Sequence, residues 1–281
     1  MSRAVQAQVA AVDHEGPRPP GHLWRDLVES FRHPEFWALS SWLDILVRSR
    51  RSYLGPLWLL TPTAIYVFGV GAFFAGMHGK TMSQFAAHVA LGVVVFRTLM
   101  TALITSTGVF TGSHSFIMDG RTRLTDYVLQ SLARSAFDLL TALPVVAIAL
   151  AMYTGVDATG LLLALPMMVL IYLNAFWVSV AFALVGARYP DLGQVLANVS
   201  TFLFLLTPII WASDTVPPGS IRAKLMVLNP FFHFVELFRG PILGGPVPML
   251  SLWVVCGMTL GGLVVATLLY RRYARFVPLW I

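Results

Sequence analysis

Long uninterrupted apolar stretches constrain this chain more than any other feature of its sequence. A helix that spans a lipid bilayer needs about 20 mainly apolar residues, because lipid offers its backbone no hydrogen-bonding partner. Charged residues make up only 11% of the chain, against about 25% in a soluble domain, so they could not cover a surface that faces water. The sequence predicts an all-α integral membrane protein with six transmembrane helices: 57–76, 85–110, 136–153, 161–187, 195–212 and 250–270.

The segment 213–249, between the fifth and sixth predicted spans, is apolar but rich in proline. Proline removes a backbone donor and breaks helices, so we expect no continuous span here. Two pieces, 221–228 and 231–238, are too short to cross the bilayer and are predicted to form a re-entrant helical hairpin at the outer side. Asn229 and Pro230 separate the two pieces. Glu236 and Arg239, three residues apart, are expected to form a structural ion pair.

The residues before the first predicted span divide into two parts. Residues 1–22 lack an apolar core and end in a run of glycine and proline, so we expect a flexible cytoplasmic tail. Residues 23–56 place apolar side chains among charges at helical spacing, with an interruption at Pro34, which predicts an amphipathic interface segment on the inner leaflet. Residues 57–281 then form the six-span transmembrane domain.

Basic residues are distributed unevenly between the two sides of this arrangement. With both ends of the chain inside, 14 of the 19 Lys and Arg residues fall on the cytoplasmic side, 4 fall outside, and Arg97 lies within a span. The positive-inside rule therefore predicts that both termini are cytoplasmic. The same distribution explains the net charge of +6 as membrane topology, so we expect no nucleic-acid partner.

Motifs for catalysis and nucleotide binding are missing from the sequence. Residues 79–81 (Gly-Lys-Thr) imitate the end of a phosphate-binding loop, but Phe74 stands where that loop needs its first glycine. The sequence contains no HExxH, CxxC or GxSxG pattern, its seven histidines are scattered, and Cys256 is its single cysteine. We therefore expect neither an enzyme nor a metal or cofactor site in this chain.

The most informative stretch, Arg-Ser-Arg-Arg-Ser-Tyr-Leu-Gly-Pro-Leu-Trp, covers residues 48–58 at the start of the first span. One interpretation is a positive-inside anchor followed by a helix start at the Gly-Pro pair. The other is a phosphate-binding cluster at a channel entrance, where arginine side chains and the free N–H groups of a helix start meet a head group. Its candidate residues are Arg48, Arg50, Arg51, Leu54, Gly55 and Trp58.

Five motifs in order make the chain resemble the ABC-type permeases that export polysaccharides. They are the Arg-Ser-Tyr-Leu-Gly-Pro-Leu-Trp run, Ala-Arg-Tyr-Pro-Asp-Leu at 187–192, Thr-Pro-Ile-Ile-Trp at 207–211, Asn-Pro-Phe at 229–231 and Glu-Leu-Phe-Arg-Gly-Pro at 236–241. The resemblance runs from about Trp37 to the C-terminus and is strongest to the O-antigen branch, with capsule and teichoic acid exporters as relatives. It implies a permease of the bacterial inner membrane that exports polysaccharide attached to polyprenyl pyrophosphate.

The resemblance also implies partners and coupling residues. It implies a homodimer in the membrane with two copies of a separate ABC ATPase subunit, which would bind ATP and Mg²⁺ while this chain binds neither. The polar loop at 116–131 would carry the short helix that docks on the ATPase, with Asp119, Arg121 and Arg123 as coupling residues. Membrane lipid and the lipid-linked glycan complete the expected partners.

Residues inside the predicted spans supply three channel candidates, Arg97, Tyr66 and Phe202. A charged side chain at the centre of a bilayer costs about 3 kcal/mol on insertion scales. Arg97 is therefore expected either to face a cavity or a partner, or to lie near a helix end and reach toward the interface. Most aromatic side chains will face lipid or neighbouring helices, whereas a minority can offer flat apolar platforms to sugar rings.

Other functions fit the sequence less well. A permease of the same architecture could export a drug or a lipid, but such relatives lack the paired Leu-Gly-Pro-Leu-Trp and Asn-Pro…Glu-Leu-Phe-Arg motifs. An ion-coupled carrier is expected to show two related halves and midplane charges. A membrane glycosyltransferase needs acidic catalytic residues. Neither set of features is evident in the sequence.

Overall fold

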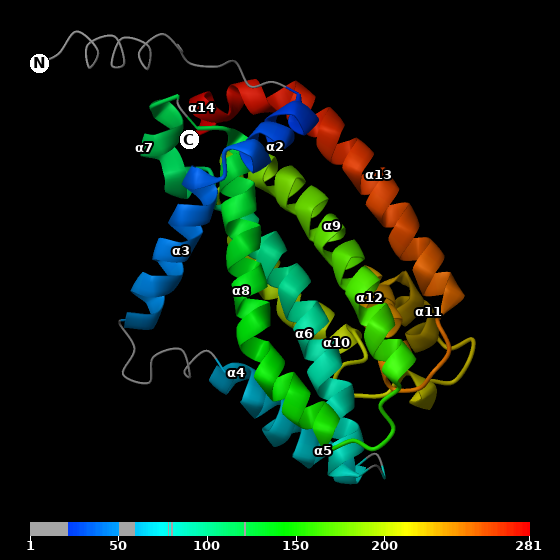
Figure 1. Cartoon of the computed structure of the whole chain (residues 1–281). Helices are drawn as coiled ribbons and strands as arrows, with labels where there is room; N and C mark the ends of the chain where they lie inside the picture. The colour runs from blue at the N-terminus through cyan, green and yellow to red at the C-terminus, as the bar shows by residue number, and fades with distance from the viewer. Residues whose placement is uncertain (1–21, 51–59, 78, 80, 121) are drawn as a thin grey trace, which may run out of the picture.

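Four long apolar helices form the centre of the molecule (Figure 1). The computed structural model describes residues 22–50, 60–77, 79, 81–120 and 122–281, with the side chains of these ranges except those of 48–50. Each of the four helices is long and apolar enough to cross a bilayer: α6 (Met82–Thr107), α8 (Leu124–Ala151), α9 (Ala158–Arg188) and α13 (Met249–Tyr273). No strand occurs among the described residues, so the all-α prediction is confirmed.

Two shorter apolar stretches accompany the long helices. The first consists of α4 (Thr61–Ala64), the π-helical segment η2 (Ile65–Val70) and α5 (Gly71–Met77), and the second is α10 (Leu192–Leu206). Figure 1 shows α9 and α13 running toward the same end of the molecule, so the chain must return between them through the segment that begins with α10. The six predicted spans thus correspond to four long helices and two shorter ones, and a count of six crossings stays a prediction.

The interior is built around α6, on which α5, α8, α9 and α12 (Pro230–Ile242) pack. The start of α6 is fixed by Thr81, whose hydroxyl accepts a hydrogen bond from the Gln84 amide at 3.4 Å. Small residues allow the neighbouring helix to come close, as they commonly do in membrane proteins. A Cβ added at Gly186 of α9 would lie 2.1 Å from the carbonyl oxygen of Thr107, so glycine is required at this crossing.

Two helices precede the membrane body, α2 (Leu23–Arg32) and α3 (Glu35–Arg50). The predicted interruption at Pro34 is confirmed, because the two helices are separated there. Polar contacts fasten α2 to the long helices: the Tyr270 hydroxyl donates to Asp26 at 2.9 Å, and Ser30 lies 2.7 Å from Thr125. Figure 1 places α2 at the same end of the molecule as α7 (His114–Met118) and α14 (Val277–Trp280).

The proline-rich segment folds as two short helices, α11 (Ile221–Leu228) and α12. The bounds of α11 agree with the prediction, while α12 extends beyond 238 and contains Pro241. Asn229 links the two helices, because its side-chain oxygen caps the Phe231 amide at 3.0 Å and its Nδ2 donates to Thr207 at 2.8 Å. Since α12 also packs on α9 and α13, it belongs to the body of the protein, and its re-entry into a membrane stays a prediction.

Some predicted boundaries are wrong. The third span is predicted to begin at 136 after a polar loop at 116–131, but α7 ends inside this range, at Met118, and α8 already begins at Leu124. Asp126 explains the difference, because it is buried and its Oδ2 accepts a hydrogen bond from the Arg123 amide at 2.9 Å. This carboxylate stabilises the start of a helix instead of marking a solvated turn. The fifth span ends at Leu206, before Pro208, and not at 212.

Candidate functional site

One side of the molecule presents apolar helices that the chain itself does not cover. None of the residues of α10 is buried, although most of them are apolar. An aromatic cluster joins it to the rest: the ring of Phe204 lies 5.5 Å from that of Tyr66 and 5.4 Å from that of Phe96. Phe202 is 64% exposed, because two residues along a helix turn a side chain to nearly the opposite direction. The structure therefore does not bring the channel candidates Tyr66 and Phe202 together.

Arg97 lies on α6, most of whose residues are buried, but Arg97 itself is exposed. Its Nη1 donates to the Thr63 hydroxyl of α4 at 3.3 Å, and no acidic side chain pairs with it in the described part of the chain. It stands ten residues before Thr107, which is about 15 Å along the helix axis. That distance is half the thickness of a bilayer core. Arg97 therefore lies deep in the predicted span, which disfavours the interpretation that it reaches to the interface from a helix end.

Most residues of the predicted entrance cluster lie outside the described residues. Arg51, Leu54, Gly55 and Trp58 fall outside the described residues, and Arg48 and Arg50 belong to the last turn of α3 without described side chains. Their role as a pyrophosphate site stays a prediction.

The predicted coupling residues separate into two groups. Asp119 is exposed just after α7, where Phe116 and Met118 also project with 58% and 56% of their surface exposed. Arg123 instead turns toward α2, where its Nη2 pairs with Glu29 at 3.0 Å, and Arg121 lies outside the described residues. The sequence argument missed Phe116 and Met118 because it treated the loop as polar.

A buried ionic cluster around Arg239 holds α12, which lies in the half of the molecule away from α7 (Figure 1). Arg239 is buried, and its Nη2 donates to Glu236 at 2.8 Å, so the predicted ion pair is present. Its Nη1 donates to the Pro208 carbonyl at 2.7 Å and lies 2.9 Å from Nε2 of His88 on α6. Nε2 of His88 also lies 3.1 Å from the Trp211 carbonyl oxygen, so it accepts from Arg239 in one tautomer and donates to Trp211 in the other. Burial lowers the pKa of Arg239, and the Glu236 carboxylate opposes that effect.

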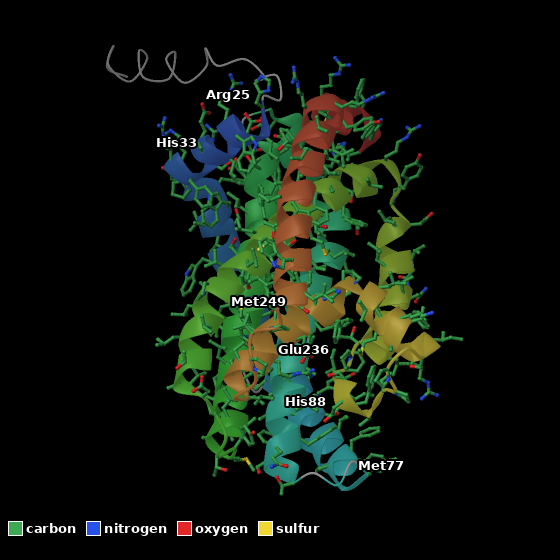
Figure 2. All side chains as sticks on the ribbon, turned by 90° about the vertical axis from the view of Figure 1, so that its right-hand side faces the viewer. Arg25, His33, Met77, His88, Glu236 and Met249 are labelled. Carbon is green, nitrogen blue, oxygen red and sulfur yellow. The ribbon has the colours of Figure 1, made fainter. Side chains whose placement is uncertain are left out.

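Figure 2 labels His88 and Glu236, two members of this cluster, which come from α6 and α12 respectively. The cluster connects the central helix, the end of α10 and the helix α12 through one arginine. His88 could not be found from the sequence, because a single histidine in an apolar stretch carries no pairing signal. These contacts fix α12 against α6 and against the segment that follows α10.

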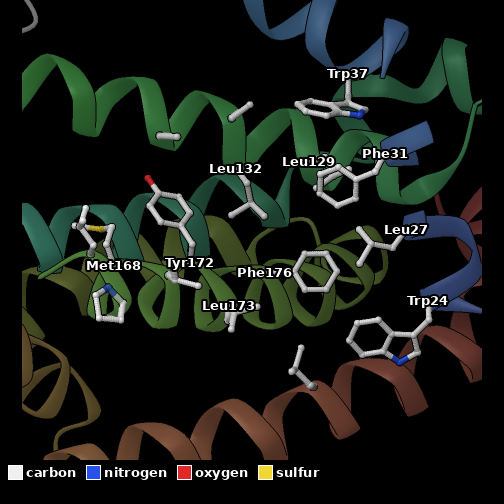
Figure 3. Close-up of a pocket in the computed structure, with 16 residues that line it drawn as sticks. Trp24, Leu27, Phe31, Trp37, Leu129, Leu132, Met168, Tyr172, Leu173 and Phe176 are labelled. Atoms are coloured by element: carbon white, nitrogen blue, oxygen red, sulfur yellow. The ribbon is translucent and has the colours of Figure 1, made fainter. Parts of the chain in front are cut away.

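A second surface feature is an apolar groove of about 760 Å³ between α2, α8, α9 and α13. Figure 3 shows Trp24, Leu27 and Phe31 of α2 at one end of the groove and Met168 and Tyr172 of α9 at the other. The Tyr172 hydroxyl has no hydrogen-bond partner among the described residues. The groove is lined by apolar side chains, and the role of α2 as an amphipathic interface helix stays a prediction.

Comparison with known proteins decides the family. Residues 35–243 match the model of the ABC-2 type transporter family. The chain belongs to this family. A curated relative, the O-antigen export system permease protein RfbA of Myxococcus xanthus, is 24% identical over 205 residues, which cover 70% of this chain and 75% of the relative. This ABC-2 transporter chain is therefore a multi-pass membrane protein and a transport component, whose family works with a separate ABC ATPase subunit.

The family match extends from α3 to the end of α12. It thus includes the exposed α10, Arg97, α7 and the Arg239 cluster, whereas α2 and α13 lie outside it. Groups of three or more His, Cys, Asp or Glu residues that could hold a metal ion are not found in the described ranges.

Proposed function

We propose that this chain is the permease subunit of an ATP-driven exporter that moves polyprenyl-pyrophosphate-linked polysaccharide, of the O-antigen type, across a bacterial inner membrane. Family membership supports the exporter, and the Myxococcus relative supports the glycan substrate. The observation that carries the proposal is the exposed Arg97, deep in α6 and beside helices that the chain leaves uncovered. A charged side chain at this depth needs a polar path or a partner.

We place that path between two copies of the chain. In the apolar window of α6, 72% of the residues are buried, so packed side chains fill the centre of a single copy. The uncovered helices α4, α5 and α10 would meet a second copy, and a homodimer would enclose Arg97 and Tyr66 in a shared channel. The returns through α4–α5 and α10 and the basic residues on the side of α2 and α14 support six crossings with both termini in the cytoplasm.

The two ends of this path have proposed contacts. At the cytoplasmic end, α7 with Phe116, Met118 and Asp119 would dock on the ATPase, which binds ATP and Mg²⁺. Exposed apolar side chains flanked by charge are typical of such contact surfaces. The arginines at 48, 50 and 51 would meet the pyrophosphate of the lipid carrier at the inner leaflet. At the periplasmic side, Asn229, Pro230, Glu236 and Arg239 would hold the re-entrant hairpin.

Export is tested by deleting the gene in its bacterium and supplying either the natural chain or an Arg97→Gln variant. We expect the deletion to abolish the surface polysaccharide and to leave lipid-linked glycan on the cytoplasmic side, and the variant to reduce export at normal protein levels. An unchanged surface polysaccharide after deletion would show that the chain exports something else, such as a drug or a lipid.

Orientation is tested separately with a reporter that is active only in the cytoplasm. Fusions after Arg188 and after Arg275 should be active, and a fusion after Lys224 should be inactive. Activity at Lys224 would contradict the six-span arrangement.

A further inference from the structure

A polar cavity of about 590 Å³ lies at the cytoplasmic end of the molecule, between α3, α8 and the turn from α6 to α7. It is separate from the channel face and from the apolar groove of Figure 3. Three aromatic rings form one part of its wall. The ring of Phe36 lies 5.4 Å from that of Tyr127 and 5.8 Å from that of Phe116, each nearly edge to face. Tyr127 is fully buried, so Phe36 and Phe116 supply the apolar part of the wall beside the polar groups.

The polar part of the wall contains a carboxylate, an amide and a guanidinium side by side. Asp44 of α3 accepts a hydrogen bond from Gln130 Nε2 at 3.0 Å and pairs with Arg134 of α8. The side chains of Arg134 and Asp44 are 42% and 44% exposed, so a ligand can reach this ion pair.

Hydroxyl groups continue from this cavity into the membrane. Thr105 of α6 lines the cavity and lies 3.0 Å from the Ser131 hydroxyl of α8. Thr101 and Arg97 follow on the same face of α6, because residues four apart lie one above the other. Thr105, Thr101 and Arg97 thus form a line of polar side chains along α6 that runs from the cavity wall toward the channel face.

We propose that this cavity binds one uncharged sugar ring of the lipid-linked glycan before transport, an inference that rests on the proposed function. A sugar hydroxyl both donates and accepts, so neighbouring hydroxyls can donate to Asp44 and accept from Arg134 without breaking their ion pair. Phe36 and Phe116 offer apolar contacts to the sugar, as in small-molecule sites that combine aromatic walls with a few placed polar groups.

The charges of the cavity exclude the other occupants. A phosphate would meet the Asp44 carboxylate, and the repulsion of two anions opposes its binding to Arg134. A hydrocarbon chain would displace water from the partly exposed carboxylate and guanidinium and offer them no hydrogen bond in return, which is costly. A hydroxyl-rich neutral group supplies hydrogen bonds to both charged side chains.

The test measures binding to the purified full chain in lipid nanodiscs. The probes are farnesyl pyrophosphate alone and farnesyl pyrophosphate that carries glucose, galactose, mannose or N-acetylglucosamine. We expect at least one sugar-bearing probe to bind about tenfold more tightly than the sugar-free probe. Asp44→Asn and Gln130→Met should reduce this difference to less than about twofold, with little change for the sugar-free probe.

Glu29→Gln is the matched control, because it removes a carboxylate that pairs with an arginine at the same end but outside the cavity. It should keep the full difference between probes. If Asp44→Asn does not fold, Gln130→Met alone decides, since it leaves the ion pair in place. Equal binding of all probes, or an unchanged difference in the cavity variants, would overturn the inference and leave the proposed function standing. Failure of every probe to bind would overturn both.

Discussion

The helices α6 and α10 are both apolar, yet the protein uses them in opposite ways. The most apolar window of α6 is 72% buried within the chain, whereas α10 has no buried residue. Apolar composition therefore shows that a helix avoids water, but it does not show whether protein or lipid covers the helix. The chain covers α6 with its own helices, while α10 is left to lipid or to a second copy. Arg97 marks where these two environments meet, since it projects from α6 to the uncovered side.

The largest effect is expected at the cluster that joins the two helices. Arg239→Gln should lower the free energy of unfolding by about 3–5 kcal/mol, because it leaves Glu236 and the Pro208 carbonyl at the end of α10 without their buried partner. Thermal melting of the purified protein in detergent measures the loss. Glu29→Gln, which breaks a more exposed pair, should cost less than about 1 kcal/mol. Equal melting temperatures for the two variants would show that Arg239 does not hold α12.

A slightly smaller effect is expected where α6 meets α9. Gly186→Ala should destabilise the protein by about 3 kcal/mol, at the upper end for overpacking, because the new Cβ meets backbone atoms of Thr107 that no rotamer change can move. The control is Gly257→Ala on α13, where nothing lies within 4 Å of the added Cβ, and which should be neutral or slightly stabilising. The same melting assay distinguishes them, and a stable Gly186→Ala protein would contradict the packing of this crossing.

Sequence reasoning succeeded where a local rule decides the outcome. Proline placed the break at Pro34 and the ends of α11, and spacing on one short helix paired Glu236 with Arg239. It failed where the local structure depends on a contact with a residue far away in the sequence. The polar residues at 116–131 suggested a solvated loop, but Asp126 is buried at the start of α8 and Arg123 binds Glu29 of α2.

The candidate site shows the same division. The depth of Arg97 followed from its place in an apolar stretch, but its contact with Thr63 and its exposure did not. The uncovered state of α10 was also beyond prediction, because a buried and an exposed apolar helix in a membrane have the same composition. Its cause lies outside a single chain if the homodimer is correct. His88 and the aromatic partner Phe204 needed the fold, since each contacts residues far along the chain.

A third variant decides between lipid and a second copy as the cover of α10. Val199→Trp adds bulk to an exposed position of this helix. Lipid would accommodate the ring, whereas a second copy would not, so we expect the association of two copies to weaken about tenfold, or about 1.4 kcal/mol. Subunit photobleaching in nanodiscs measures the dimer fraction. Leu260→Trp, at an exposed position of α13, is the control, and identical dimer fractions for both variants would place α10 against lipid.

The smallest expected effect concerns the contact that orients α10 from within one copy. Tyr66→Leu removes the ring that packs against Phe204 at 5.5 Å, and an aromatic pair of this kind contributes about 1 kcal/mol. Because α10 has few other contacts with the body, the loss should appear as local opening, with amide hydrogen exchange in α10 about fivefold faster and exchange in α6 unchanged. Phe202→Leu alters the opposite side of α10 and should leave both rates as they are when copies are kept apart by dilution. Unchanged exchange in Tyr66→Leu would mean that α10 is positioned by its ends alone, through α9 and the Pro208 contact with Arg239, and not by the aromatic cluster.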